Sequence, residues 1–133
     1  MKTSTEIRED VQEYYGKILK TKNDLQTSAC CAADSMPAYL RPYLKNIHEE
    51  VQSRFYGCAS TFPSALYGKT VVDLGCGSGR DCYLLAQVVG PDGLVIGIDM
   101  TDEQLAVASK HVPYHTSKFN LEKPNVDFRK GWI

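Results

Sequence analysis

A run of β-branched and apolar residues passes directly into three closely spaced glycines, and this junction limits the possible folds more than any other feature. Residues 70–74 are Thr-Val-Val-Asp-Leu and are followed by Gly75-Cys-Gly77-Ser-Gly79. The first run is typical of a short buried strand, and glycines let the backbone turn tightly without a Cβ in the way. Apolar residues at helical spacing begin after Arg80. The sequence therefore predicts a strand, a tight turn and a helix in direct succession.

Strands and helices alternate over residues 67–133. After the first strand the expected elements are helix 80–89, buried strand 94–99, a helix that opens with a Thr101–Gln104 capping box and that Pro113 kinks or restarts, and a strand from Val126. This order predicts an α/β fold, in which the chain holds the β-α-β-α-β part of a Rossmann-like parallel sheet. Because a doubly wound sheet has about six strands, we expect an incomplete domain and an N-terminal fragment of a longer protein. The alternative is a compact three-stranded domain completed by an oligomer.

Residues 1–66 differ in character, and we expect them to form an N-terminal helical extension with a cysteine loop. Apolar residues at helical spacing predict a helix over residues 6–19, and Thr3 with Glu6 forms a capping-box pattern at its start. A polar, poorly periodic stretch over residues 21–37 is typical of a loop.

A second helix is predicted after this loop. Pro42 fits its first turn, and its apolar face continues through Leu44, Ile47, Val51 and Phe55. Both predicted helices of the extension are amphipathic, so each needs a partner surface on which to bury its apolar face.

Composition excludes several classes of protein. The 133 residues carry a formal net charge of −1, so a nucleic-acid-binding surface is not expected. No apolar run approaches the roughly 18 residues that span a bilayer, and the first ten residues lack the apolar core of a secretory signal. We therefore expect a cytoplasmic protein without nucleic acid or membrane as a partner.

The chain has five cysteines, which are Cys30, Cys31, Cys58, Cys76 and Cys82. In a reducing compartment they are expected to be free thiols, metal ligands or redox groups rather than structural disulfides. Cys30 and Cys31 are adjacent rather than spaced as C-x-x-C, so a zinc site is not expected there. His48 is expected on a solvated helix face, and His111 and His115 as surface or capping groups rather than metal ligands.

The glycine segment also predicts a ligand site. It follows a strand and opens a helix, and Asp99 ends the next strand 20 residues after Gly79, the position from which an acidic residue binds ribose hydroxyls. A plain helix-entry turn is the alternative role for Asp99. The glycines are spaced G-x-G-x-G after Asp73 rather than as the G-x-G-x-x-G of dinucleotide enzymes. This pattern resembles motif I of the S-adenosylmethionine-dependent methyltransferases of the Rossmann-like class.

The resemblance is closer to one family, the arsenite methyltransferases, and covers nearly the whole chain. The segments that carry it are Tyr14-Tyr-Gly-Lys-Ile-Leu-Lys, Asp24-Leu-Gln-Thr-Ser-Ala-Cys-Cys31, Phe55-Tyr-Gly-Cys58, Asp73-Leu-Gly-Cys-Gly-Ser-Gly-Arg-Asp-Cys-Tyr83 and Gly97-Ile-Asp-Met-Thr101. Methyltransferases in general share only the glycine loop and the acidic residue at the end of the second strand, so the two cysteine segments are the specific ones.

This resemblance implies S-adenosylmethionine as cofactor and names the residues that bind it. The implied cofactor-binding residues are Tyr56, Asp73, Gly75, Cys76, Gly77, Gly79, Asp99 and Met100. Asp73 is expected near the amino-acid portion of the cofactor, through water or backbone, and Asp99 at the ribose. Met100 is expected against the adenine or ribose, with a core methionine as the alternative, and Tyr56 is expected to close over the cofactor.

The resemblance also implies transfer of methyl groups to trivalent arsenic held by thiols. Cys30 and Cys58 are the implied arsenic-binding and disulfide-relay cysteines, with glutathione or thioredoxin as the class of reductant. Two further cysteines of the family are expected beyond Ile133, so we expect the chain alone to be inactive. Cys82 is expected to pack in the core and Cys76 to fit the loop as a small residue. The alternatives are another small-molecule methyltransferase, or a non-catalytic module that binds S-adenosylmethionine or senses thiols.

Overall fold

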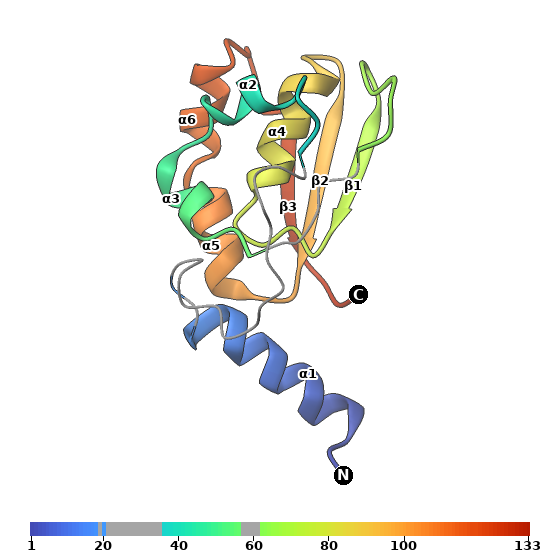
Figure 1. The fold of residues 1–133 in the computed structure, drawn as a ribbon, viewed down its shortest axis with the longest axis vertical. Coiled ribbons are helices and arrows are strands. Elements are labelled where there is room, and N and C mark those ends of the chain that lie inside the picture. Colours follow the sequence, from blue (N-terminus) through green and yellow to red (C-terminus); the bar gives the residue numbers. More distant parts are fainter. Residues whose placement is uncertain (19, 21–35, 57–61) are drawn as a thin grey trace.

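The computed structural model describes residues 1–18, 20, 36–56 and 62–133. Its centre is a sheet of three parallel strands in the order β1 (Thr70–Leu74), β2 (Leu94–Asp99) and β3 (Val126–Lys130). The helices that connect successive strands are α4 (Arg80–Val89) and, between β2 and β3, α5 (Asp102–Lys110) and α6 (Val112–Lys118). Figure 1 shows α4 packed against the sheet and running roughly along its strands. The predicted β-α-β-α-β order of a Rossmann-like parallel sheet is confirmed.

In residues 67–133, the helices and strands begin and end near the glycines and prolines from which their boundaries were predicted. Helix α4 ends at Val89 and is capped by Gly90, which has a φ of 74°. Strand β2 spans the predicted residues. Helix α5 ends at Lys110 and α6 begins with Pro113 in its first turn, so the predicted restart is confirmed. The predicted capping box at Thr101 and Gln104 is wrong, because the Thr101 side chain makes no capping bond and the Gln104 amide donates to the Arg54 carbonyl instead.

The core lies between the sheet and an outer layer of short helices, α2 (Arg41–Leu44) and α3 (Glu49–Ser53). Helix α4 fills this space, and Figure 1 shows α2, α3 and α6 on the side of α4 away from the sheet. Tyr83 of α4 is fully buried, donates its hydroxyl to the Ala108 carbonyl and stacks on His115 with ring centroids 3.6 Å apart. This contact ties α4 to α5 and α6.

At β1, the face of the sheet opposite α4 is not covered by any of the described residues. Val72 and Leu74 are 51% and 60% exposed, whereas Val71, which points to the α4 face, packs in the core. The expectation of a buried first strand is therefore wrong for this chain, since its side chains alternate between a helix-covered face and an open one.

The N-terminal segment forms α1 (Ser4–Glu13) and one π-helical turn, η1 (Tyr14–Ile18). The predicted capping box of Thr3 and Glu6 is present. Figure 1 shows α1 projecting away from the sheet, and Ile7 and Val11 are exposed, so the expected burial of its apolar face is not found among the described residues. No helix in the described ranges is long and apolar enough to cross a bilayer.

The second predicted helix is divided in two. Helix α2 ends at Leu44 and α3 begins after His48, whose Nδ1 accepts the Glu50 backbone N–H at 3.1 Å. Ile47 and Val51 are nevertheless both buried, as the periodicity predicted. The break occurs because the His48 N–H is hydrogen-bonded to His115 Nε2, at 3.1 Å, rather than within a continuous helix.

The histidines correct another expectation. His111 and His115 are 6% and 1% exposed, so they are buried rather than surface groups. His111 does occupy the predicted cap position, between α5 and α6. His48 caps a helix rather than lying on a solvated face. Burial lowers the pKa of His115 to about 4, so its ring is neutral at physiological pH. The His115 Nδ1–H donates to the His111 carbonyl at 2.8 Å, which leaves Nε2 as the acceptor for His48.

Asn125 provides a test of how β3 is held to α4. Its buried amide donates to the Ala86 and Gly90 carbonyls, each at 2.9 Å. We expect Asn125→Ala to lower the free energy of unfolding by about 1–3 kcal/mol, because each of two buried carbonyls loses one of its two donors and keeps only a backbone N–H. Chemical denaturation of the full chain measures it. Asn46→Ala is the matched control, since the half-buried Asn46 makes one such bond, to Gln87; equal losses in the two variants would contradict this account.

Candidate functional site

A cavity of about 240 Å³ lies at the carboxyl ends of β1 and β2. Ligands of open α/β sheets bind at this edge. The glycine loop forms one side of the cavity, the start of α5 forms a second, and residues of η1 and of the segment after α3 form the outer wall.

The glycine loop has a left-handed backbone conformation at three positions, which glycine adopts without strain. Gly75, Gly77 and Gly79 have φ values of 76°, 55° and 90°, in the region that side chains with a Cβ rarely occupy. The backbone N–H groups of Gly75 and Cys76 donate to the Ile98 carbonyl at 2.7 and 3.0 Å. The loop is therefore fastened to the end of β2.

Asp99 links this loop to α5. One carboxylate oxygen accepts the Gly77 backbone N–H and the other accepts the Thr101 backbone N–H, each at 2.9 Å. An ionised carboxylate has about four lone-pair sites, so both oxygens keep acceptor capacity. The two backbone bonds orient Asp99 at the cavity wall and leave it able to accept hydroxyl donors from a ligand.

Asp73 takes a different position. It is not among the residues that line the cavity, and its Oδ2 accepts the Cys82 thiol at 3.3 Å. Burial raises the pKa of Asp73 and outweighs the opposing hydrogen bond from Cys82. The hydrogen bond with Cys76, together with burial, raises the pKa of Cys82 well above its usual range. Cys82 is thus a buried, protonated thiol with a packing role, as expected.

Two sides of the cavity carry polar atoms whose partners are missing among the described residues. Arg54 Nε and Gln104 Oε1 are buried, make no hydrogen bond there, and belong to residues that line the cavity. Such groups are rare in folded proteins and call for a ligand or ordered water. The outer wall is otherwise aromatic: Tyr15 and Tyr56 have ring centroids 6.2 Å apart, and Phe55 carries the Arg80 guanidinium 3.3 Å from its ring centre.

Residues 66–133, just over half of the chain, match the family model described as a methyltransferase domain. The chain belongs to the methyltransferase-domain family. This domain and the segment before it are also similar to curated proteins named arsenite methyltransferase. The chain is 56% identical to that of Aquipseudomonas alcaligenes over 127 residues, 53% to the rat protein and 49% to the human protein, in each case over 96% of this chain.

The chain is also similar to a solved structure. An arsenic(III) S-adenosylmethionine methyltransferase from Chlamydomonas reinhardtii matches 73% of this chain and 33% of its own, with a TM-score of 0.70 and 41% identity. The chain spans about a third of the length of the curated relatives it matches: 36%, 35% and 34% of the three proteins.

The methyltransferase domain brings most of the predicted cofactor residues together. Those that line the cavity are Tyr56, Gly75, Cys76, Gly77, Asp99 and Met100. Gly79 and Asp73 do not line it. A Cβ at Gly79 would meet Phe128 at 2.9 Å, and Asp73 is hydrogen-bonded to Cys82. Cys30 and Cys58 lie outside the described residues, so their roles stay predictions, as do the cofactor roles of the residues in the cavity.

Six lining residues of this methyltransferase domain and its extension were not predicted, namely Tyr15, Arg54, Phe55, Ser78, Thr101 and Gln104. Four of these six, Tyr15, Phe55, Ser78 and Thr101, stand inside the quoted motifs and could have been included from their positions. Tyr15 precedes Gly16, which packs so closely on α5 that a Cβ would lie 2.7 Å from the Thr101 methyl group. An aromatic residue beside a glycine inside a helical pattern was the available signal for a close contact.

Gly97 tests the packing beneath the loop of this methyltransferase domain. A Cβ at Gly97 would lie 2.9 Å from both the Cys76 and Cys82 sulfurs and 2.8 Å from the Phe128 ring. We expect Gly97→Ala to lower the free energy of unfolding by about 1–3 kcal/mol through overpacking. Thermal and chemical unfolding measure this loss.

The control is the same substitution in a Cys82→Ala background. Removing one of the crowded sulfurs leaves room for the new methyl group, so the cost of Gly97→Ala should fall by more than additivity allows. A cost that is unchanged in this background would place the strain somewhere other than at the two sulfurs.

Proposed function

We propose that this chain is the cofactor-binding part of an arsenite methyltransferase, which transfers methyl groups from S-adenosylmethionine to thiol-bound trivalent arsenic. The observation that carries the proposal is the cavity, in which the glycine loop, Asp99 and residues of the N-terminal half meet. Sequence identity of 49–56% to arsenite methyltransferases covers both the loop and that half. A generic methyltransferase has no need of the cysteine segments in residues 1–66.

The residues of the cavity suit the proposed cofactor. Asp99 has acceptor capacity for ribose hydroxyls beyond its two backbone bonds, and Met100 offers an apolar surface for the adenine or ribose. Arg54 Nε is a buried donor without a partner among the described residues and suits the cofactor carboxylate. Gln104 Oε1 is the corresponding acceptor and suits the ammonium group.

When bound, S-adenosylmethionine supplies an electrophilic methyl group. The work of the protein is then to orient the reactants and exclude water, because the displacement needs no general base. Gly75, Gly77 and Asp99 fix the floor of the cavity, and Tyr15 and Tyr56 cover it with apolar ring surface. These roles follow from the positions of side chains that line one cavity.

The proposed arsenic site uses Cys30 and Cys58, with a thiol reductant such as glutathione or thioredoxin restoring them. Trivalent arsenic is soft and binds thiolates, so its ligands must ionise near neutral pH. Cys82 does not meet this requirement, because its pKa is raised and its thiol is buried against Asp73. The assignment of Cys30 and Cys58 rests on the resemblance to the arsenite methyltransferases.

The cofactor part of the proposal is tested at Asp99. We expect Asp99→Ala to weaken S-adenosylmethionine binding by about 1.5–3 kcal/mol, or roughly 10- to 150-fold in Kd, through loss of charge-assisted hydrogen bonds to the ribose. Calorimetric titration of the full chain measures it. Asp102→Ala removes an exposed carboxylate at the start of α5, whose partner is Lys130, and should leave Kd unchanged. An unchanged Kd in Asp99→Ala would remove Asp99 from the binding site.

The arsenic part is tested at the two cysteines. We expect Cys30→Ser and Cys58→Ser each to reduce the later methyl transfers in the full-length enzyme while S-adenosylmethionine affinity stays nearly intact, because a serine hydroxyl neither binds arsenic nor forms the relay disulfide. Peptide mapping without reduction should find a peptide linking Cys30 to Cys58 after turnover.

Cys31→Ser is the matched control for this pair, since Cys31 is adjacent to Cys30 in sequence and carries no role in the proposal. It should keep full activity. If no linked peptide forms and both serine variants also keep full activity, the relay is absent from this protein.

A further inference from the structure

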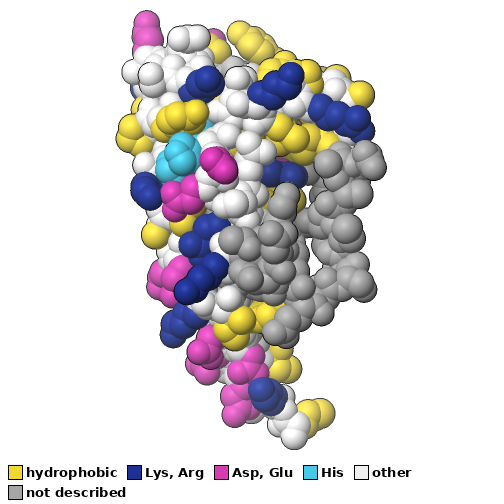
Figure 2. Space-filling model, turned by 60° about the vertical axis from the view of Figure 1, so that its left-hand side comes forward, with side chains coloured by type: hydrophobic (Ala, Val, Ile, Leu, Met, Phe, Trp, Pro, Cys, Tyr) yellow, Lys and Arg dark blue, Asp and Glu magenta, His cyan; other side chains and the backbone are white. Residues whose placement is uncertain are grey.

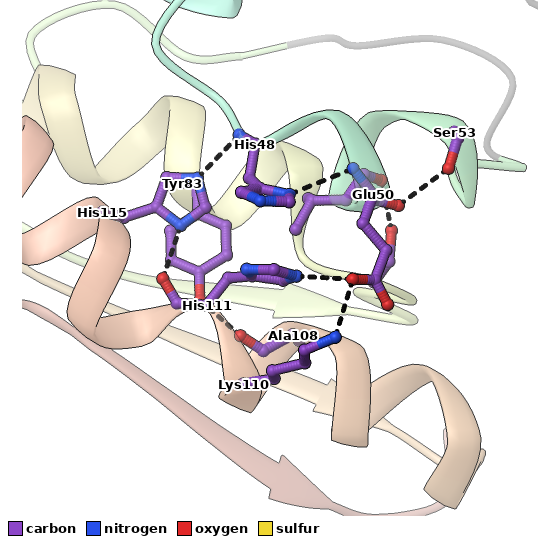
Figure 3. A network of polar contacts seen from close by, with 10 residues as sticks. His48, Glu50, Ser53, Tyr83, Ala108, Lys110, His111 and His115 are labelled. Atoms are coloured by element: carbon purple, nitrogen blue, oxygen red, sulfur yellow. Dashed lines mark hydrogen bonds and ion pairs between the residues drawn. The ribbon is translucent and has the colours of Figure 1, made fainter.

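A second group of functional side chains lies away from the cofactor cavity, between α3 and the junction of α5 with α6. Figure 3 shows His48, Glu50 and His111 gathered there. Each offers one donor atom, and these atoms all lie within 4.8 Å of one another. His111 Nε2 is 2.9 Å from Glu50 Oε2, and the His48 and His111 rings stack with centroids 3.8 Å apart. None of the three residues lines the cavity.

The backbones that carry the two imidazoles are held by one buried ring. His115 accepts the His48 backbone N–H at Nε2, at 3.1 Å, and donates its Nδ1–H to the His111 carbonyl, at 2.8 Å. His115 is itself fixed by stacking on Tyr83. The separation of His48 and His111 is therefore set by the core, as a binding site requires, rather than by mobile surface side chains.

The cluster is also open to solvent on one side. Figure 2 shows histidine side chains at the surface, between acidic and basic side chains. His48 and Glu50 are half-buried and His111 is buried. An ion could therefore reach the donor atoms from solution and keep water as a further ligand.

We propose that His48, Glu50 and His111 bind a divalent transition-metal cation, with Zn²⁺ as the probe and water completing the coordination. Two imidazole nitrogens and one carboxylate oxygen form a donor set that suits Zn²⁺ and not Mg²⁺, which prefers oxygen ligands. Zinc–ligand distances of about 2.0–2.2 Å place tetrahedral donor atoms roughly 3.3 Å apart. The His111–Glu50 pair is already near this separation. The His48 nitrogen lies within 4.8 Å of both atoms and has to move closer when the ion binds.

Lys110 competes with the cation for Glu50. Its Nζ is 3.0 Å from Glu50 Oε2, but its side chain is 64% exposed, and exposed ion pairs of this kind contribute little. A divalent ion displaces the ammonium group into solvent. This competition predicts that removal of Lys110 strengthens metal binding, which a merely structural histidine cluster would not do.

A bound cation fixes the element that leads to the cavity wall. Helix α3 is held at its other side by Ser78 of the glycine loop, whose hydroxyl donates to the Val51 carbonyl at 2.7 Å. Arg54, Phe55 and Tyr56 follow α3 directly and line the cavity. The metal site and the cofactor cavity thus share one element but no residue, so either can fail without the other.

The test is titration of the full chain with Zn²⁺ by calorimetry, in the absence of cofactor, with Mg²⁺ as the control cation. We expect one Zn²⁺ equivalent whose affinity falls by more than about 100-fold in His48→Asn and in His111→Gln, since losing a direct ligand costs more than the 10- to 100-fold loss caused by an outer-shell partner. His48→Asn keeps a side chain suited to the helix cap. Lys110→Met should raise the affinity several-fold.

Cysteine thiolates are also good Zn²⁺ ligands, so the ligands are identified with Co²⁺. The difference spectrum of the Co²⁺-loaded chain and its His48→Asn variant should contain ligand-field bands without a thiolate-to-cobalt charge-transfer band. Thermal unfolding without metal verifies that the variants are folded. If His111→Gln does not fold, the result for His48→Asn decides the outcome. Equal Zn²⁺ binding in the chain and in His48→Asn, or a thiolate band in the difference spectrum, would overturn the proposal.

Discussion

The two hydrogen bonds that Asp99 accepts from Gly77 and Thr101 hold the cavity together. The first fixes the glycine loop at the end of β2, and the second fixes the start of α5 beside it. Each of these parts then receives a piece of the N-terminal half: Ser78 of the loop bonds to α3, and the first turn of α5 packs against Gly16. The outer wall of the cavity is therefore positioned by a carboxylate on the sheet.

The α/β half could be predicted because its signals are local. Glycines and prolines mark its boundaries, and apolar runs mark β2 and α4. The division of the second predicted helix could not be, since it depends on His115 accepting the His48 N–H across 67 residues of sequence. The exposure of β1 was also missed, because the composition of a strand does not tell how many of its faces are covered.

The candidate site was predicted to the extent that motifs carry it. Gly75, Gly77 and Asp99 are recognisable from spacing alone, and the structure places them around one cavity. Arg54 reaches that cavity only because α3 docks on α5, a tertiary contact without a sequence motif. Tyr15 stands in one of the quoted motifs, but its place at the cavity depends on the docking of η1 on α5. The histidine cluster was missed for the same reason: its donors come from two elements, and His111 gives no local sign that it lies next to Glu50.

The attachment of α1 has a mechanical consequence. The helix meets the rest of the chain through η1, where Gly16 packs on α5, and through Gln12, which donates to the Met100 carbonyl. With ten residues at 1.5 Å each, α1 is a lever about 15 Å long. Because Tyr15 at its base lines the cavity, a tilt of about 20° there would displace the far end by roughly 5 Å. A pair of fluorophores, one at Ser4 and one on the sheet domain, would thus report small movements of the cavity wall as a larger change in the distance between the two labels.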